Sequence, residues 1–400
     1  MVEQHGKTLV PQIRFAGFTD PWEQRKLGEL YQKNDERNTD GLGSERTLSV
    51  ASMTFNSTGN GADESSLPNY KRLRLGDIAF EGHANKEFTY GRFVLNDAGN
   101  GIMSPRFTCL RPIVEQEYSF WKYFIHSEKV MRPILVNSTK SGTMMNELVV
   151  EDFLEQEILV PSLPEQRQIG GFFDRLDSLI TLHQRKYDKL CVLKKSMLDK
   201  MFPKGGSLYP EIRFAGFTDP WEQRKLGELF EESDERASDR EILSVSVANG
   251  IYPASESDRE TNPGASLANY KIVHFGDVVY NSMRMWQGAV DASLYDGIVS
   301  PAYVVARPNS EVYARFFARL LRQPMLLKQY QQVSQGNSKD TQVLKFDDFA
   351  SIGISMPASE NEQCQIGAFF DHLDSLITLH QRKLELLRNI KKSMLDKMFV

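Results

Sequence analysis

The chain has 400 residues, enough for two or three domains, and its content of 40% hydrophobic and 25% charged residues is ordinary for a globular protein. No apolar run approaches the roughly 18 residues of a membrane-spanning helix. Residues 1–7 lack a signal-peptide core, so we expect a cytoplasmic protein that contacts no membrane. The net charge of −5 argues against uniform attraction to a polyanion, and three cysteines without metal-ligand spacing (Cys109, Cys191 and Cys364) predict reduced thiols.

Residues 13–30 recur without a change at residues 212–229. Each copy of this exact repeat holds an Asp-Pro turn followed by Trp-Glu-Gln-Arg-Lys-Leu-Gly-Glu-Leu, which predicts a short strand or helix that packs on the next domain. A second pair of matching segments lies at residues 165–202 and 362–399. The chain is therefore a tandem duplication of two units of about 200 residues.

Each half also has a variable region, at residues 31–163 and 230–360. Its landmarks survive: residues 69–71 (Asn-Tyr-Lys) match residues 269–271, and residues 101–105 (Gly-Ile-Met-Ser-Pro) match residues 297–301 (Gly-Ile-Val-Ser-Pro). Apolar runs at residues 77–80 and 277–280 predict strands. Aromatic-rich segments at residues 118–131 and 312–321 predict one helix in each region, ended by Pro133 and Pro324. We expect a mixed α+β globule with a shared fold in each region.

Positive charge is concentrated in these two variable regions. Residues 71–140 hold 11 Lys and Arg against 7 Asp and Glu, and residues 271–345 hold 9 against 5. Two separate basic regions suit two anion-binding surfaces, although charge alone is equally compatible with ordinary solvated faces.

The segments at residues 165–202 and 362–399 predict two long helices. Apolar residues recur with heptad spacing over about five heptads, and Pro203, Gly205 and Gly206 end the first segment. Plain core packing would satisfy this pattern, but we favour an antiparallel two-helix spacer with helices roughly 57 Å long. Its predicted interface consists of Ile169, Phe172, Phe173, Leu176, Leu179, Ile180, His183, Leu190, Met197, Ile366, Phe369, Phe370, Leu373, Leu376, Ile377, His380, Leu387 and Met394.

Catalytic motifs are not found in the sequence. It contains no Gly-x-x-x-x-Gly-Lys-Ser/Thr phosphate loop, no Asn/Asp-Pro-Pro-aromatic motif of amino-methyltransferases and no clean Gly-x-Gly-x-x-Gly. His183 and His380 occupy equivalent heptad positions, where a polar side chain that sets helix register is favoured over a metal ligand. We therefore expect no metal site and no catalytic residue.

The exact repeats, the paired heptad helices and the Pro-Ser-Leu-Pro-Glu-Gln-Arg-Gln-Ile segment at residues 161–169 together resemble the specificity subunit of type I restriction–modification enzymes. The resemblance covers essentially the whole chain. It implies two target-recognition domains that each read one half of a split sequence in double-stranded DNA. It also implies that the two helices space these halves and dock two methyltransferase subunits. Cys364 stands where the first helix has Arg167, which is a departure at the start of the second helix.

Further expectations come from the same resemblance. Restriction subunits with motor and nuclease activity join the complex, and S-adenosylmethionine, ATP and Mg²⁺ bind to the partner subunits. This chain then has no cofactor and performs no catalytic step. The implied fold is α+β, with two mixed α/β target-recognition domains separated by two long antiparallel helices, an internal tandem duplication and pseudo-two-fold symmetry. The predicted boundaries are residues 1–163 and 206–360 for the recognition domains, and residues 164–205 and 361–400 for the spacer helices.

Base reading requires side chains with paired donors or acceptors, such as Arg for guanine and Asn or Gln for adenine, while Lys, Ser and Thr hold phosphates. The best candidates are polar stretches that differ between the halves and lie beside matching landmarks. In the first domain they are Glu81, His83, Asn85, Lys86, Arg92, Ser138, Thr139, Lys140, Ser141 and Thr143. In the second domain they are Asn281, Ser282, Arg284, Trp286, Gln287, Gln335, Asn337, Ser338, Lys339 and Thr341.

The main alternative is a two-armed scaffold that binds two other proteins through the same helices and no DNA. Salt separates the two hypotheses, because binding through DNA phosphates weakens with a slope of roughly −0.9 per neutralised phosphate on a log–log plot. A self-contained methyltransferase or nuclease is disfavoured by the missing motifs.

Overall fold

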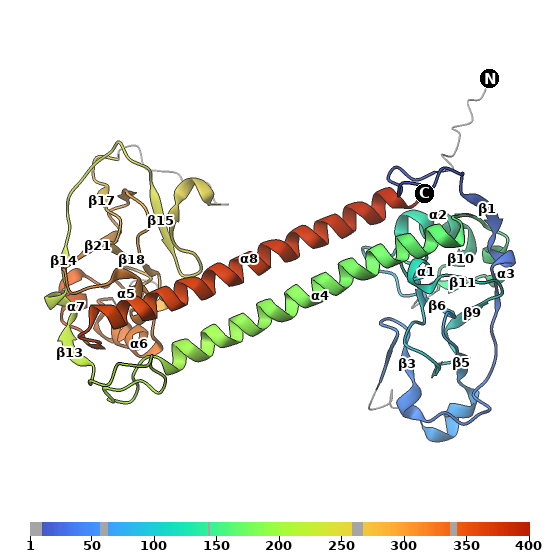
Figure 1. The fold of residues 1–400 in the computed structure, drawn as a ribbon, viewed down its shortest axis with the longest axis horizontal. Coiled ribbons are helices and arrows are strands. Elements are labelled where there is room, and N and C mark those ends of the chain that lie inside the picture. The colour runs from blue at the N-terminus through green and yellow to red at the C-terminus, as the bar shows by residue number, and fades with distance from the viewer. Residues whose placement is uncertain (1–9, 57–62, 143–144, 258–266, 337–341) are drawn as a thin grey trace. The chain divides into compact units, whose positions relative to one another are not determined.

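The computed structural model describes residues 10–56, 63–142, 145–257, 267–336 and 342–400 (Figure 1). The chain divides into two compact units: unit 1 consists of Met1–Gln184 and Arg382–Val400, and unit 2 consists of Arg185–Gln381. Each unit contains one variable region, one copy of the exact repeat and one end of each long helix.

Unit 1 begins with nine short strands and continues with helices and strands that alternate along the chain. Its strands are β1 Glu23–Lys26, β2 Tyr31–Lys33, β3 Leu48–Ser49, β4 Thr54–Phe55, β5 Lys71–Leu73, β6 Ile78–Glu81, β7 Arg92–Leu95, β8 Gly101–Met103, β9 Thr108–Pro112, β10 Thr139–Lys140, β11 Glu147–Leu148 and β12 Glu157–Val160. Its helices are α1 Tyr118–Phe124, α2 Glu128–Ser138, α3 Val150–Leu154, the first part of α4 Leu163–Lys200 and the last part of α8 Glu360–Met398.

The main sheet of unit 1 has four antiparallel strands in the order β2-β9-β6-β7. Strand β6 confirms the prediction at residues 77–80. Its first three residues are all buried because one face packs on the helices of unit 1 and the other face packs on strands β3, β5 and β8. Strand β1 comes from the exact repeat and pairs antiparallel with β12, with Glu23 opposite Val160. The exact repeat is therefore tied to the chain just before α4 begins.

Aromatic side chains fill the core of unit 1 where α1 meets α4 and the end of α8. Phe399 is 1% exposed, and its ring centroid lies 5.3 Å from Phe124 of α1 and 5.8 Å from Phe173 of α4. Gly170 permits the close approach of α4 to α1, because a Cβ atom at this position would lie 2.2 Å from Ser119 Oγ. The end of α8 thus completes the core around the start of α4.

Unit 2 repeats this plan. Its strands are β13 Glu222–Lys225, β14 Phe230–Glu232, β15 Leu243–Ser246, β16 Gly250–Pro253, β17 Lys271–Val273, β18 Val278–Asn281, β19 Val290–Ala292, β20 Gly297–Val299, β21 Tyr303–Pro308 and β22 Gly353–Met356. Its own helices are α5 Ala314–Leu320, α6 Pro324–Val333 and α7 Phe346–Ala350. The main sheet has the order β14-β21-β18-β19, and β13 from the exact repeat pairs with β22 just before α8. The shared fold predicted from the landmarks is confirmed.

The prediction of a single helix in each variable region is wrong. The first segment is divided into α1 and α2, and Pro133 lies inside α2 instead of ending a helix. The apolar face of α2 is buried in the core, which offsets the backbone hydrogen bond that Pro133 cannot donate. In unit 2, Pro324 is the first residue of α6, a position where no intrahelical N–H donor is needed.

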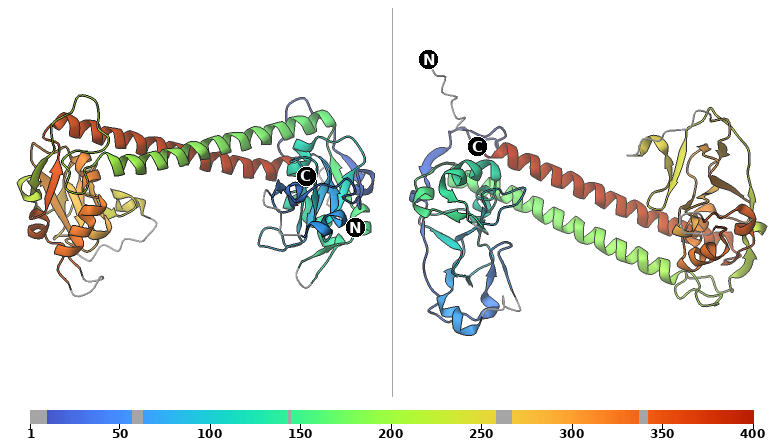
Figure 2. Two further views of the ribbon diagram at one scale, coloured as in Figure 1. Left: turned by 90° about the horizontal axis from the view of Figure 1, so that it is seen from below. Right: turned by 180° about the vertical axis from the view of Figure 1, so that it is seen from behind.

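The two predicted long helices are confirmed as α4 and α8. Lys391 of α8 donates a hydrogen bond to Asp177 of α4 at 2.6 Å in unit 1, and the equivalent pair, Lys194 and Asp374, lies in unit 2. Within each unit the helices therefore lie side by side and antiparallel, as both views in Figure 2 show. No helix among the described residues is both long and apolar enough to cross a membrane.

The predicted spacer interface is only partly a helix–helix seam. Ile169, Phe173 and Leu176 belong to the core of unit 1, and Ile366, Phe370 and Leu373 belong to the core of unit 2. Leu179 is 42% exposed and lies outside the seam, because a helix with 3.6 residues per turn drifts away from a heptad stripe. The remaining members are half-buried: Phe172, Ile180, His183, Leu190, Met197, Phe369, Leu376, Ile377, His380, Leu387 and Met394.

Each long helix also begins at a buried ion pair with the exact repeat. Arg14 donates two hydrogen bonds to Glu165, at 2.7 and 2.8 Å, and Arg213 makes the same pair of bonds to Glu362, at 2.6 and 2.7 Å. Both carboxylates are 1% exposed. These bidentate pairs hold the exact repeat against the helix start in each unit.

Candidate nucleic-acid interface

Two loops meet at one end of the main sheet in unit 1. The first is the turn between β6 and β7, and the second is the hairpin formed by β10 and β11 after α2. Asn146 N in the hairpin donates to Gly82 O in the turn at 2.8 Å. The start of β9 lies beside the turn, because Phe80 of β6 is opposite Thr108 of β9. We call residues 82–91, 104–107, 139–142 and 145–148 the loop surface of unit 1.

Unit 2 brings the same loops together with different sequences. Leu344 N donates to Ser282 O at 2.9 Å, and an isolated bridge between Gln335 and Val343 forms the base of the second loop. We call residues 282–289, 300–303, 335–336 and 342–344 the loop surface of unit 2. The duplicated fold therefore presents two surfaces of equivalent construction, each carrying most of the described residues that were predicted to read DNA.

Some of the predicted residues on the β6–β7 turn of unit 1 have side chains engaged in ion pairs or hydrogen bonds, and others have exposed side chains. Glu81 and Arg92 are paired at 2.7 Å, and Arg92 Nη2 also donates to Ala51 O at 3.0 Å. The Asn85 Oδ1 atom accepts hydrogen bonds from the backbone N–H groups of residues 87 and 88, which shapes the turn. His83 and Lys86 are exposed. Arg92 is thus already neutralised and held in place.

The predicted residues after α2 include one that belongs to the interior. Ser138 is 1% exposed and its hydroxyl donates to Ile134 O at 2.8 Å, while the Thr139 hydroxyl donates to Leu135 O at 2.7 Å. These bonds close the end of α2, so both hydroxyl groups serve the fold. Lys140 and Ser141 are exposed at the hairpin, and Thr143 lies outside the described residues.

The loop surface of unit 2 carries a compact turn after β18. Asn281 Oδ1 accepts from Met283 N at 3.0 Å, and the indole of Trp286 donates to Met283 O at 3.2 Å. The Ser282 hydroxyl donates to Ala302 O at 2.8 Å. These bonds fix the turn and leave the other predicted side chains of the loop, Arg284 and Gln287, exposed beside each other with Nη1 and Oε1 at 3.4 Å.

The second predicted loop of unit 2 is described only at its base. Gln335 is exposed, and its amide donates to Asp348 Oδ2 at 3.0 Å. Asn337, Ser338, Lys339 and Thr341 lie outside the described residues. The DNA-reading role of all these residues stays a prediction.

Charged networks away from the loop surface account for part of the positive charge in each variable region. In unit 1 Arg111 contacts Glu36 at 2.6 Å and Asp77 at 2.9 Å, and Arg74 contacts Glu36 at 2.6 Å. The hydrogen bond from Arg74 lowers the pKa of Glu36, and Arg111 lowers it further. Partial burial raises the pKa but is outweighed, so the pKa of Glu36 is about 2. Unit 2 has the equivalent cluster, in which burial raises the pKa of Asp277. These cations are bound to carboxylates and are not available to a polyanion.

Arg106 and Phe107 were not among the predicted residues, although they lie on the loop surface of unit 1. They follow directly after the matching landmark at residues 101–105, and the equivalent residues after 297–301 are Ala302 and Tyr303. This abrupt divergence next to a landmark was the signal that could have identified them.

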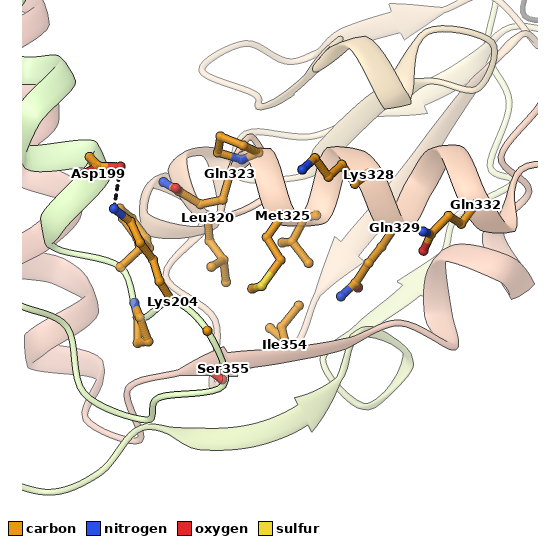
Figure 3. Close-up of a pocket in the computed structure, with 15 residues that line it drawn as sticks. Asp199, Lys204, Leu320, Gln323, Met325, Lys328, Gln329, Gln332, Ile354 and Ser355 are labelled. Atoms are coloured by element: carbon orange, nitrogen blue, oxygen red, sulfur yellow. Dashed lines mark ion pairs between the residues drawn. The ribbon is translucent and has the colours of Figure 1, made fainter.

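A cavity of about 530 Å³ in unit 2 (Figure 3) shares no lining residue with the loop surface. It is bordered by α6, β22 and the end of α4, and its lining includes Met325, Gln329, Ile354 and an Asp199–Lys204 ion pair. A smaller cavity of about 260 Å³ occupies the equivalent place in unit 1, beside α2 and β12. Neither contains a residue predicted to read DNA. Among the described residues no cluster of His, Cys, Asp and Glu could hold a metal ion.

Comparison with known proteins agrees with the duplicated architecture. Residues 19–191 and 218–389 each match the family model for the type I restriction modification DNA specificity domain. The chain is 22% identical to a putative type I restriction enzyme MjaX specificity subunit of Methanocaldococcus jannaschii, over 98% of this chain and 95% of that protein. It is also 22% identical to the type I restriction enzyme MjaVIII specificity subunit of the same organism, over 68% of each chain.

A solved structure shares the fold over the full length. The crystal structure of the S subunit of a type I restriction–modification system from M. genitalium superposes with a TM-score of 0.50 at 15% identity. The match covers 98% of this chain and 99% of the other.

Proposed function

The chain belongs to the type I restriction modification DNA specificity family, and on that premise we propose that unit 1 and unit 2 each read one half of a bipartite DNA target. The single observation that carries this proposal is the duplicated loop surface. Both units join the same two loops by the same backbone hydrogen bond, Asn146 to Gly82 and Leu344 to Ser282, while the side chains presented there differ. One scaffold with two different surfaces suits two half-sites of different sequence.

We further propose that α4 and α8 set the number of base pairs between the half-sites and dock two methyltransferase subunits. Each helix is continuous across the division between the units, which supports a spacing role. Apolar side chains remain exposed along both helices, such as Leu182 at 46%, Val192 at 68% and Leu386 at 59%. Exposed apolar residues along a helix that is already paired suit contact with further subunits.

We propose that the chain itself catalyses no step. Methylation and ATP-dependent cleavage would reside in methyltransferase and restriction subunits that bind S-adenosylmethionine, ATP and Mg²⁺. The chain supplies sequence discrimination to that complex, in the cytoplasm where it meets DNA. The sequence motifs for a phosphate loop and for amino-methyl transfer are absent, which supports this division of work.

An exchange of readers tests the proposal. Residues 31–163 are replaced with the equivalent region of a relative, and methylated motifs are mapped by sequencing modified bases in DNA exposed to the assembled complex. We expect one half-site to change while the other half-site and the gap stay as they were. The matched control replaces residues 230–360 and should change only the other half-site. Joint change of both half-sites, or binding that does not weaken as salt rises, would contradict the proposal.

A further inference from the structure

We infer that Arg106 reads a guanine in the half-site recognised by unit 1. The inference rests on the proposed function and deepens it, because it names one residue and the base class that it recognises.

Arg106 lies beside the start of the β6–β7 turn in unit 1. It is two residues before Thr108, which is opposite Phe80, and it lines one hollow with Glu81, the residue that precedes Gly82. Gly82 is the residue that accepts the hydrogen bond from Asn146 in the hairpin. A ligand that reaches the start of the β6–β7 turn through this hollow therefore also meets Arg106.

The guanidinium of Arg106 is available, whereas that of Arg92 is not. Arg92 is held by Glu81 and by Ala51 O. Arg106 is exposed, and the contact found for it among the described residues is with the ring of Phe107, whose centroid lies 4.6 Å from the Arg106 Cζ atom. Placement over an aromatic ring restricts the side chain and leaves the N–H groups of the guanidinium edge free to donate.

The hollow beside Arg106 leaves space for its guanidinium group to contact the edge of a base. Arg106 lines a hollow of about 480 Å³ whose walls also include Ser49, Glu81, Ser104 and Phe107. The hydroxyl groups and the carboxylate supply polar atoms beside apolar walls that include Leu48 and Val50. Two parallel N–H donors match the O6 and N7 acceptors of guanine in the major groove, which is the commonest specific contact that Arg makes with DNA.

The comparison between the units favours base reading over phosphate binding. Phosphate contacts position a protein on DNA and are needed by both readers, whereas base contacts must differ when the half-sites differ. The position equivalent to Arg106 is Ala302, yet the next residue is aromatic in both units, Phe107 and Tyr303. The aromatic platform is thus shared, and the guanidinium is present only in unit 1.

The test uses the full chain assembled with its methyltransferase subunits. In Arg106→Ala the residue becomes the one that unit 2 carries, and in Arg106→Lys the charge stays but the planar fork is lost. Both variants act on a randomised DNA library, and methylated sites are sequenced. We expect discrimination against the wrong base to fall by roughly 5- to 140-fold at one guanine of the half-site assigned to unit 1. The other half-site and the gap should not change.

Three results would overturn the inference. Arg106→Ala could weaken methylation equally at every site while Arg106→Lys restores it, which is the behaviour of a phosphate contact. Both variants could keep the full motif, which would remove Arg106 from the interface. The relaxed base could be adenine or a pyrimidine instead of guanine. If Arg106→Ala fails to fold, Arg106→Lys decides alone. A wild-type complex without any sequence preference would instead refute the proposed function.

Discussion

Phe399 and Phe202 allow the two units to be destabilised one at a time. Phe399 is 1% exposed, and its ring centroid lies 5.9 Å from Phe120, 5.3 Å from Phe124 and 5.8 Å from Phe173, all within unit 1. Phe202 is the equivalent residue, 3% exposed, in the core of unit 2. We predict that Phe399→Ala loosens unit 1 and that Phe202→Ala loosens unit 2.

The expected magnitude follows from truncating a buried ring. Removing a buried Phe side chain costs about 3–5 kcal/mol, because transfer free energy is lost and the cavity closes only in part. For a unit of about 200 residues each kcal/mol shifts the melting temperature by about 2–4 °C. The affected unit should therefore melt roughly 6–20 °C lower.

Hydrogen exchange with peptide-level mass spectrometry measures this effect for each unit separately. In Phe399→Ala the peptides of β6, β9 and α1 should exchange faster, while those of β18, β21 and α5 keep the wild-type rate; Phe202→Ala should give the reverse pattern. Leu386→Ala is the matched control on α8, because Leu386 is 59% exposed and its loss should change stability by no more than about 0.5 kcal/mol. Equal loosening of both units by Phe399→Ala, or protection identical to wild type, would refute the packing argument.

Three other predictions follow from named contacts. A fragment of residues 1–205 should form a two-fold dimer in sedimentation experiments, because it carries both Asp177 and Lys194 for the seam and its own Phe202; a monomer at high concentration would count against this. Glu36→Gln should lower the free energy of unfolding at pH values above 4.5, the ordinary pKa of a glutamate carboxyl. Because the folded-state pKa of Glu36 is depressed, the difference between wild type and variant should disappear as the pH falls toward about 2. A difference in unfolding free energy that stays constant down to about pH 2 would contradict this prediction. Inserting four residues between residues 189 and 190 and between residues 378 and 379 lengthens each helix by about 6 Å, so the gap between half-sites should grow by one or two base pairs; methylation only at the original gap would show that the helices do not measure DNA.

The sequence predicted the positions of the two long helices more accurately than it predicted what these helices pack against. Heptad spacing and the absence of proline from residues 165–202 and 362–399 located α4 and α8 to within about two residues, the accuracy that helix ends allow. The same spacing could not tell a helix–helix seam from a domain core, because both bury an apolar stripe. Phe173 and Phe370 are 0% exposed, and each lies in the core of its own unit.

Two kinds of feature escaped prediction for physical reasons. The partner of Glu165 is Arg14, which lies 151 residues away in sequence, and a local charge pattern predicts only a favourable helix-dipole position for that carboxylate. The state of Arg92 was also hidden, because the ion pair with Glu81 depends on the register between β6 and β7. Charge counts indicated basic regions, yet tertiary pairing decides which cations remain free.

The two units differ at exposed positions, where a substitution changes stability little, and agree at buried positions, where a substitution would lower stability strongly. Gly170 and Gly367 are retained because a Cβ atom would lie 2.2 Å from Ser119 Oγ in one unit and 2.6 Å from a ring atom of Tyr313 in the other. The buried pair of Arg14 and Glu165 recurs in unit 2, and breaking such a pair by removing one partner costs about 3–5 kcal/mol. Substitution of an exposed loop residue has no such effect on stability. The difference between Arg106 in unit 1 and Ala302 in unit 2 therefore changes the side chains on the loop surface without disturbing the attachment of the unit to the helices. On the proposed function, new specificities can therefore arise one unit at a time.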